Sequence, residues 1–197
     1  MGAPDSKTRA RLLDAAEHIL LHQGHAAVTS RQVGAQAGLK PQLVHYYFRS
    51  MDELLVEVFR RRADERLARA ERALAEDCSL RAIWVLNADP RGAAFNIEFV
   101  ALAKHNPVVR AEVARYAERH RATQLEAVRR ALEAAGVSDD RLPPVVALLL
   151  MTGLTQVVSL ERTLGVIAGH DETISFVSDL IDGLESSEAE PGPGRVG

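Results

Sequence analysis

Residues 28–55 restrict the fold more than any other stretch, because their pattern fits two short helices joined by a tight turn. Gly38 stands where the chain must reverse, and glycine tolerates the positive φ of such a turn. Thr29 predicts a helix start, since Gln32 follows three residues later as in a capping box. The pattern therefore predicts a helix-turn-helix whose second helix, about residues 41–47, can enter a DNA major groove. Its small core is expected from Val28, Val33, Ala37, Leu39, Val44 and Phe48.

The side chains between these apolar positions are left facing outward, and they form the predicted contact with DNA. Gln42 stands in the first turn of the second helix and can pair with adenine through two hydrogen bonds. Lys40 can reach guanine or a phosphate, and Arg31 a phosphate or a flanking guanine. The predicted DNA-contacting residues are Thr29, Arg31, Lys40, Pro41, Gln42, His45, Tyr46 and Tyr47.

Charge is distributed unevenly along the chain. The whole sequence has a net charge of −3, yet residues 1–50 hold six Lys and Arg against three Asp and Glu. The first quarter is therefore at +3 and the rest at −6. An asymmetry of this sign indicates that the N-terminal part meets a polyanion and the remainder does not.

The rest of the sequence predicts an all-α protein of about nine helices, without a convincing period-2 strand. Caps, prolines and glycines place the remaining helices at about 6–23, 50–77, 79–88, 92–106, 107–136, 144–165 and 171–185. The expected caps are Asp5 or Ser6, a second capping box of Ser50 with Glu53, Asn106 before Pro107, and Asp171, and Pro41 is expected in the first turn of the helix at 41–47. We expect a DNA-binding domain at 1–50, a helical ligand-binding and dimerisation domain at 51–185, and a disordered tail at 186–197. A single cysteine, Cys78, excludes an internal disulfide and fits a reducing cytoplasm.

One long segment is unusually apolar. Leu142–Leu160 has no charged residue across 19 positions, which is long enough to span a bilayer. Its prolines, threonines and Gln156 favour a helix covered by protein instead. We expect Leu142–Leu164 and Ile174–Leu184 to form a homodimer interface as a four-helix bundle, with a fully internal helix in a monomer as the alternative.

The order of these parts resembles the TetR family of bacterial transcription regulators. Residues of Leu12–Leu55 that fall at the family's spacing are Thr29, Val33, Gly34, Ala37, Gly38, Leu39, Val44, Tyr47, Phe48, Glu53, Leu54 and Leu55. The resemblance implies a cytoplasmic dimer that binds two half-sites of a palindromic operator. It also implies a small-molecule pocket in the helical body, whose occupation releases the DNA, and it implies repression in most members.

Three positions depart from the family's pattern. Lys40 replaces the usual Ser or Thr before the recognition helix, His45 replaces the usual Tyr within it, and Met51 replaces a frequent Lys at the start of the next helix. These changes bear on operator strength and sequence rather than on the fold.

The effector site is predicted from apolar bulk around residues 83–102, with a few polar groups to anchor a ligand. An apolar cavity with few polar anchors is the usual form of such a site, so a largely hydrophobic effector is expected. The predicted pocket residues are Trp84, Asn87, Phe95, Phe99, Leu102, Tyr116, Met151 and Gln156.

Catalytic and metal-binding signatures are weak in this sequence. His18 and His22 have a spacing that can bind metal, but no third ligand is evident, so a surface pair is favoured. No cofactor, metal or catalytic residue is predicted. Two other interpretations stay open: an all-helical small-molecule-binding or catalytic protein with an incidental helix-turn-helix, and an architectural DNA-binding protein without an inducer.

Overall fold

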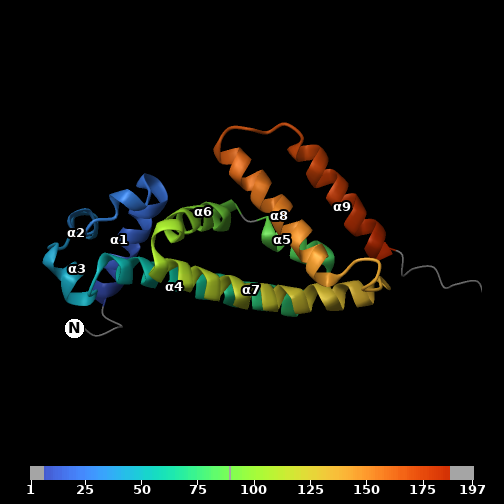
Figure 1. Cartoon of the computed structure of the whole chain (residues 1–197), viewed down its shortest axis with the longest axis horizontal. Coiled ribbons are helices and arrows are strands. Elements are labelled where there is room, and N and C mark those ends of the chain that lie inside the picture. Colours follow the sequence, from blue (N-terminus) through green and yellow to red (C-terminus); the bar gives the residue numbers. More distant parts are fainter. Residues whose placement is uncertain (1–6, 89, 187–197) are drawn as a thin grey trace, which may run out of the picture. The chain divides into compact units, whose positions relative to one another are not determined.

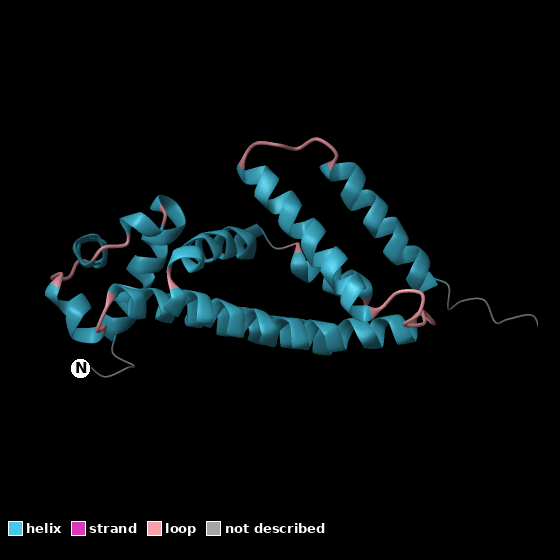
Figure 2. Ribbon diagram, in the orientation of Figure 1, coloured by secondary structure: helices cyan, strands magenta, loops and turns pink. Residues whose placement is uncertain are grey.

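The computed structural model describes residues 7–88 and 90–186, and every regular element in that part of the chain is a helix (Figure 2). The all-α fold with about nine helices is therefore confirmed. Figure 1 labels the elements α1 (Lys7–Gln23), α2 (Ser30–Ala37), α3 (Gln42–Tyr47), α4 (Met51–Glu76), α5 (Leu80–Asn87), α6 (Pro90–His105), α7 (Pro107–Ala134), α8 (Pro144–Thr163) and α9 (His170–Ser186).

Several helix ends differ from the sequence prediction. A short 3₁₀ helix, His25–Ala27, follows Gly24 and was not predicted. Asp171 lies in the first turn of α9 instead of capping it, because the helix already begins at His170. Pro41 is the N-cap of α3 instead of lying in its first turn. The expected cap of the first helix, Asp5 or Ser6, lies outside the described residues.

The chain packs as two compact units. Unit 1 comprises residues 1–67 and 94–118, and unit 2 comprises residues 68–93 and 119–197. Helices α4 and α7 each contribute residues to both units. The expected functional boundaries at 50/51 and 185/186 remain predictions; of the expected tail, Ser186 ends α9 and the rest lies outside the described residues.

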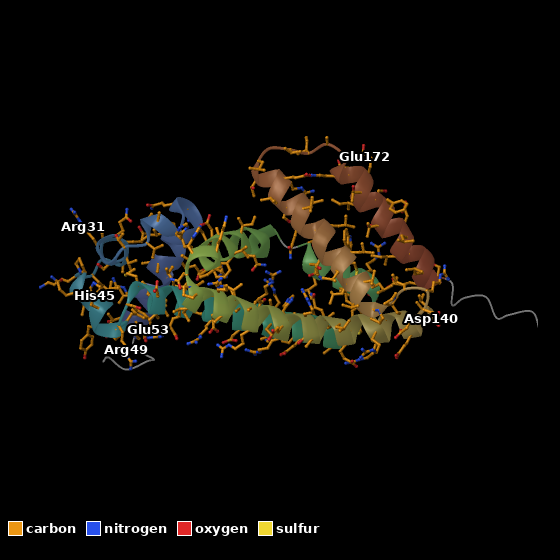
Figure 3. All side chains as sticks on the ribbon, viewed as in Figure 1. Arg31, His45, Arg49, Glu53, Asp140 and Glu172 are labelled. Carbon is orange, nitrogen blue, oxygen red and sulfur yellow. The ribbon has the colours of Figure 1, made fainter. Side chains whose placement is uncertain are left out.

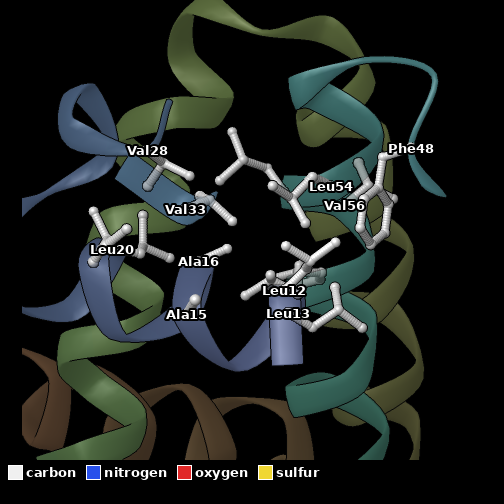
Figure 4. Packing of buried hydrophobic residues seen from close by; sticks show 14 of the residues in the cluster. Leu12, Leu13, Ala15, Ala16, Leu20, Val28, Val33, Phe48, Leu54 and Val56 are labelled. Atoms are coloured by element: carbon white, nitrogen blue, oxygen red, sulfur yellow. The ribbon is translucent and has the colours of Figure 1, made fainter. Parts of the chain in front are cut away.

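The core of unit 1 joins the first three helices to the start of α4. Leu12, Ala16 and Leu20 on α1 have no exposed surface, as expected from their helical spacing (Figure 4). Val33 on α2 and Val44 on α3 are equally buried against them. Burying these side chains fixes α2 and α3 on α1, so the helix-turn-helix has its own apolar core. Further members include Phe48, Leu54, Val58, Phe59, Phe99 and Val109.

The core of unit 2 is made by α5, α7, α8 and α9, together with Leu74 near the end of α4. Ile83 and Trp84 come from α5, Val128 from α7, Leu148 from α8 and Ile181 from α9, and each is at most 5% exposed. Helix α8 is long and apolar enough to cross a membrane by length and composition, and a third of its most apolar window is buried within the protein. Core helices of soluble proteins pass the same test, so this finding is weak evidence for a membrane span.

Candidate nucleic-acid interface

Helix α2 is fixed at both ends as the sequence predicts, with one difference. The Thr29 hydroxyl accepts a hydrogen bond from the Gln32 backbone N–H at 3.2 Å, which satisfies one of the free donors of the first turn. The reciprocal half of the expected capping box is not formed, because the Thr29 N–H donates to the Ala27 carbonyl at 2.9 Å instead. One side-chain bond is therefore enough to start the helix here.

The turn between α2 and α3 depends on two glycines. Gly38 ends α2 in the left-handed conformation, with φ of 64° and ψ of 38°, as the sequence predicts. A Cβ atom at Gly34 would lie 3.0 Å from the Leu39 carbonyl oxygen and 3.1 Å from Pro41 backbone atoms. The turn thus lies directly against α2, and this close approach explains a glycine in the middle of that helix.

Helix α3 is attached to the core by one side and exposes the other. Val44 and Phe48 are almost completely buried. Gln42 and His45 lie on the exposed side, and Tyr46 is 54% exposed. A helix with polar side chains along a free face has the form required of a major-groove reader.

The predicted DNA contacts share this surface of unit 1. Thr29, Arg31, Lys40 and Pro41 are exposed as well, and Figure 3 shows Arg31 and His45 directed outward. Tyr47 differs, since it is half-buried against the core and meets the Tyr46 ring edge-on, with 5.1 Å between ring centroids. Seven of the eight predicted side chains are therefore exposed, and Tyr47 both packs against the core and leaves part of its surface open.

Two arginines that contribute to the positive charge of the first 50 residues make contacts within the chain. Arg9 forms an ion pair with Glu57 at 2.8 Å, and its guanidinium lies over the Phe48 ring. Arg11 donates a hydrogen bond to the carbonyl oxygen of Ala37, which is the last residue of α2. Both hold α1 against the helix-turn-helix, so their main role is positional. Nothing in their local sequence indicated this.

Arg49 is an exposed cation that the residue-by-residue prediction left out. It lies between α3 and α4, and its side chain makes no hydrogen bond or ion pair with any part of the chain that the structure describes. Its backbone N–H donates to the Glu53 carboxylate at 2.6 Å, while the Ser50 hydroxyl accepts from the Glu53 N–H at 3.0 Å. The Ser50 half of the expected capping box therefore forms, whereas the Glu53 carboxylate accepts from the Arg49 N–H in place of the Ser50 N–H. Arg49 stands two positions before Met51, where the family often has a Lys.

The N-terminal segment matches the family model of bacterial regulatory proteins of the tetR family over residues 12–58. The HTH-type transcriptional regulator BetI of Rhizobium meliloti (strain 1021) is 40% identical over 52 residues, which are 26% of this chain and 26% of that protein. Residues 12–58 therefore carry a domain of the TetR family. The match extends over about a quarter of the length of the curated relative.

Solved structures show that the TetR-type fold extends over most of the chain. A transcriptional regulator from Saccharomonospora viridis, solved in complex with choline, superposes with a TM-score of 0.74 at 20% identity, covering 90% of this chain and 97% of that one. The fatty acid degradation regulator FadR from Bacillus halodurans gives 0.67 at 12% identity, covering 96% and 100%. At these identities the likeness concerns the fold alone.

The predicted effector-pocket residues divide between the two units. In unit 1, Phe95, Phe99 and Tyr116 surround Phe59, with ring centroids 4.8 to 6.0 Å from it, and Leu102 packs partly buried against the same core. This aromatic cluster is tightly packed, so its rings fill the space between α4, α6 and α7.

In unit 2, Trp84 and Met151 are core residues, whereas Gln156 is exposed on α8. Asn87 donates to the Ile83 carbonyl at 2.9 Å and accepts from the Gln124 side chain at 3.2 Å. Gln124 is 1% exposed and was not predicted. An amide pair of which Gln124 is buried and Asn87 partly exposed can orient a ligand, but no local sequence pattern marked residue 124.

The two histidines of α1 form the surface pair that the sequence favours. Their rings stack with centroids 4.2 Å apart, and His22 Nδ1 lies 2.8 Å from the His18 carbonyl oxygen. No group of three or more potential metal ligands occurs among the residues that the structure describes.

Proposed function

We propose that the chain is a ligand-responsive transcriptional regulator, a repressor and not an enzyme, that acts in the cytoplasm as a dimer on a palindromic operator. Residues 1–50 would bind DNA, and residues 51–185 would bind the effector and form the dimer. The observation that carries the proposal is the exposed polar face of α3, on a helix-turn-helix whose core residues Val33 and Val44 have no exposed surface. The TetR-family domain at residues 12–58 supports it.

Binding to DNA beside the chain's own gene tests the proposal most directly. A fluorescently labelled duplex from that region should give a saturable anisotropy increase at nanomolar to micromolar protein, and a scrambled duplex of equal length should not. A variant with Gln42→Ala and His45→Ala together should lose the preference for the specific duplex, because both side chains lie on the free face of α3. Equal affinity for both duplexes at all salt concentrations would overturn the proposal.

The dimer is proposed to form through α8 and α9 of unit 2, which lie as the two arms of a helical hairpin (orange and red in Figure 1). Large apolar side chains are exposed along α8 at helical spacing and on α9, which is unusual for a monomer in water. A second copy related by a two-fold axis would bury this surface as a four-helix bundle. The exposed residues are Val145, Val146, Leu149, Leu150, Val157, Leu160, Leu164, Phe176 and Leu180.

The effector is proposed to be a small, largely hydrophobic molecule. Support comes from the apolar and aromatic character of six of the eight predicted pocket residues; the other two, Asn87 and Gln156, are polar, and Gln156 is exposed. Thermal-shift screening should include long-chain acids, aromatic acids and choline, the last because a solved regulator of similar fold contains it. A compound that raises Tm and releases the labelled operator at the same concentrations is the expected inducer. Stabilisation by small hydrophilic compounds alone would contradict the hydrophobic assignment.

A further inference from the structure

Five charged side chains of unit 1 form an unbroken series of ion pairs from α7 through α4 to α1. Arg9 Nη2 lies 2.8 Å from Glu57 Oε2, and Arg60 Nη1 lies 3.0 Å from Glu57 Oε1. Arg60 Nη2 lies 2.9 Å from Glu112 Oε2, and Arg115 donates to the other Glu112 oxygen. Each carboxylate thus bridges two guanidinium groups, and each of the two inner links depends on its neighbours.

The series ends beneath the recognition helix. The Arg9 guanidinium carbon lies 5.1 Å from the centre of the Phe48 ring, a cation–π distance. Phe48 is 1% exposed, and its N–H donates to the Val44 carbonyl at 2.8 Å, closing the last turn of α3. The position of the Arg9 side chain therefore bears directly on the residue that ends α3.

Glu112 is the most buried carboxylate in the series, with 11% of its side chain exposed. Buried glutamates are rare unless they are paired. The hydrogen bond from Arg60 lowers the pKa of Glu112, against the effect of burial, and Arg115 adds to this. The charge of Glu112 is thus retained in the folded protein, where it holds one side of the Arg60 guanidinium.

We propose that Glu112 is a positioning residue for α3, acting through Arg60, Glu57 and Arg9 although it does not touch the helix-turn-helix. Without the Glu112 charge, the Arg60 guanidinium can turn both of its ends to Glu57. Because a carboxylate accepts a forked pair of bonds from one arginine readily, Arg60 then competes with Arg9 for the same oxygens. Arg9 then loses its ion pair with Glu57, and its guanidinium shifts from its place over Phe48. This inference rests on the proposed function, since its main readout is operator affinity.

Competition at Glu57 makes a specific prediction about a double variant. Glu112→Gln keeps the size of the side chain but removes its charge, and it should weaken operator binding about three- to tenfold. Adding Arg60→Met removes the competitor, so the double variant should bind within about twofold of the wild type. Glu118→Gln, the same change at an exposed position of α7, is the matched control and should have no effect.

The affinities are measured by anisotropy with the labelled duplex, after the active fraction of each preparation is determined by stoichiometric titration. The salt dependence of binding should be the same for Glu112→Gln and the wild type, because no phosphate contact is lost. Loss of stability alone would lower the active fraction without rescue by Arg60→Met. Wild-type affinity in Glu112→Gln, or a double variant as weak as Glu112→Gln, would overturn the proposal.

Hydrogen exchange in the free protein gives a second readout that does not need DNA. Glu112→Gln should speed exchange of the α3 amides, Phe48 included, and leave the amides of unit 2 unchanged. The double variant should return α3 to wild-type exchange. Unchanged exchange in α3 would overturn the inference even if the wild type bound no DNA, whereas faster exchange without DNA binding would remove only the proposed function.

Discussion

Helices α3 and α8 follow the same amphipathic rule but leave opposite chemistry outside. Helix α3 buries Val44 and exposes Gln42 and His45, so its free face is compatible with water and with a nucleic acid. Helix α8 buries Leu148 but exposes Leu150, 56% of whose surface remains open. The apolar side chains of the helix-turn-helix are therefore covered within one chain, whereas those on the α8–α9 surface are left exposed to water.

The comparison is tested most strongly by removing one aromatic ring from each region. Phe48→Ala should lower the free energy of unfolding by about 3–5 kcal/mol, because the ring is buried under the helix-turn-helix. Phe176→Ala, on α9 and 68% exposed, should change the unfolding of a dilute monomer by less than about 0.5 kcal/mol. Chemical denaturation followed by circular dichroism measures both.

Phe176→Ala should instead affect the association of two chains. If Phe176 is part of the dimer surface, its removal weakens association measured by sedimentation velocity, although the folded monomer is unaffected. A large loss of monomer stability in Phe176→Ala would show that this ring packs within one chain, and the contrast between the two regions would fail.

A charge placed among the exposed apolar side chains of α8 should have the next largest effect. Leu150→Glu puts a carboxylate in the proposed interface, where it would be desolvated without a partner, so the protein should become monomeric. Apparent operator affinity should then fall about 100-fold or more, because the two recognition helices no longer bind together. Ala122→Glu, at an exposed position of α7, is the control for added charge. If the Leu150→Glu protein remained dimeric, the dimer interface would have to lie outside this part of α8.

The sequence predicted those features that depend on neighbours along the chain. The cap at Thr29, the left-handed Gly38 and the Asn106 cap of α7, whose side chain accepts from two backbone N–H groups at 3.0 and 3.1 Å, all follow from local rules. Arg9 could not be assigned in this way. Its partner Glu57 is 48 residues distant, and only the packing of α1 on α4 brings the two together.

The effector site could not be predicted from the sequence for a related reason. Its eight predicted residues were chosen for apolar bulk, and the structure places four in each unit. Bulk alone does not distinguish a ring that lines a cavity from one that fills a core, as the tight contacts of Phe95 and Phe99 with Phe59 illustrate. The pocket assignment therefore stays a prediction, as do the DNA contacts.

A salt titration of operator binding should sharpen the assignment of the polar surface. With about three phosphate-facing cations on each of two protomers, the slope of log affinity against log salt should be roughly −5. Arg49→Gln should reduce this slope by about 1 to 2 over the dimer and weaken all duplexes alike, whereas Gln42→Ala should weaken the specific duplex about tenfold and leave the slope unchanged. A slope near zero for the wild type would contradict the contact set.

The smallest expected effect concerns the pH dependence of unit 1. The pKa of Glu112 is lowered in the folded protein, chiefly by its hydrogen bond from Arg60. The unfolded side chain titrates near its ordinary value of about 4.3, so the ionised folded state is favoured fully above that pH, and this contribution disappears as the pH falls through the lower folded value. Wild-type Tm should therefore exceed that of Glu112→Gln at pH 7, and the gap should narrow below about pH 4.3. Melting curves from pH 7 to 3 at fixed ionic strength measure the gap, with Glu118→Gln as control; a gap independent of pH would mean that shape, and not charge, is what Glu112 contributes.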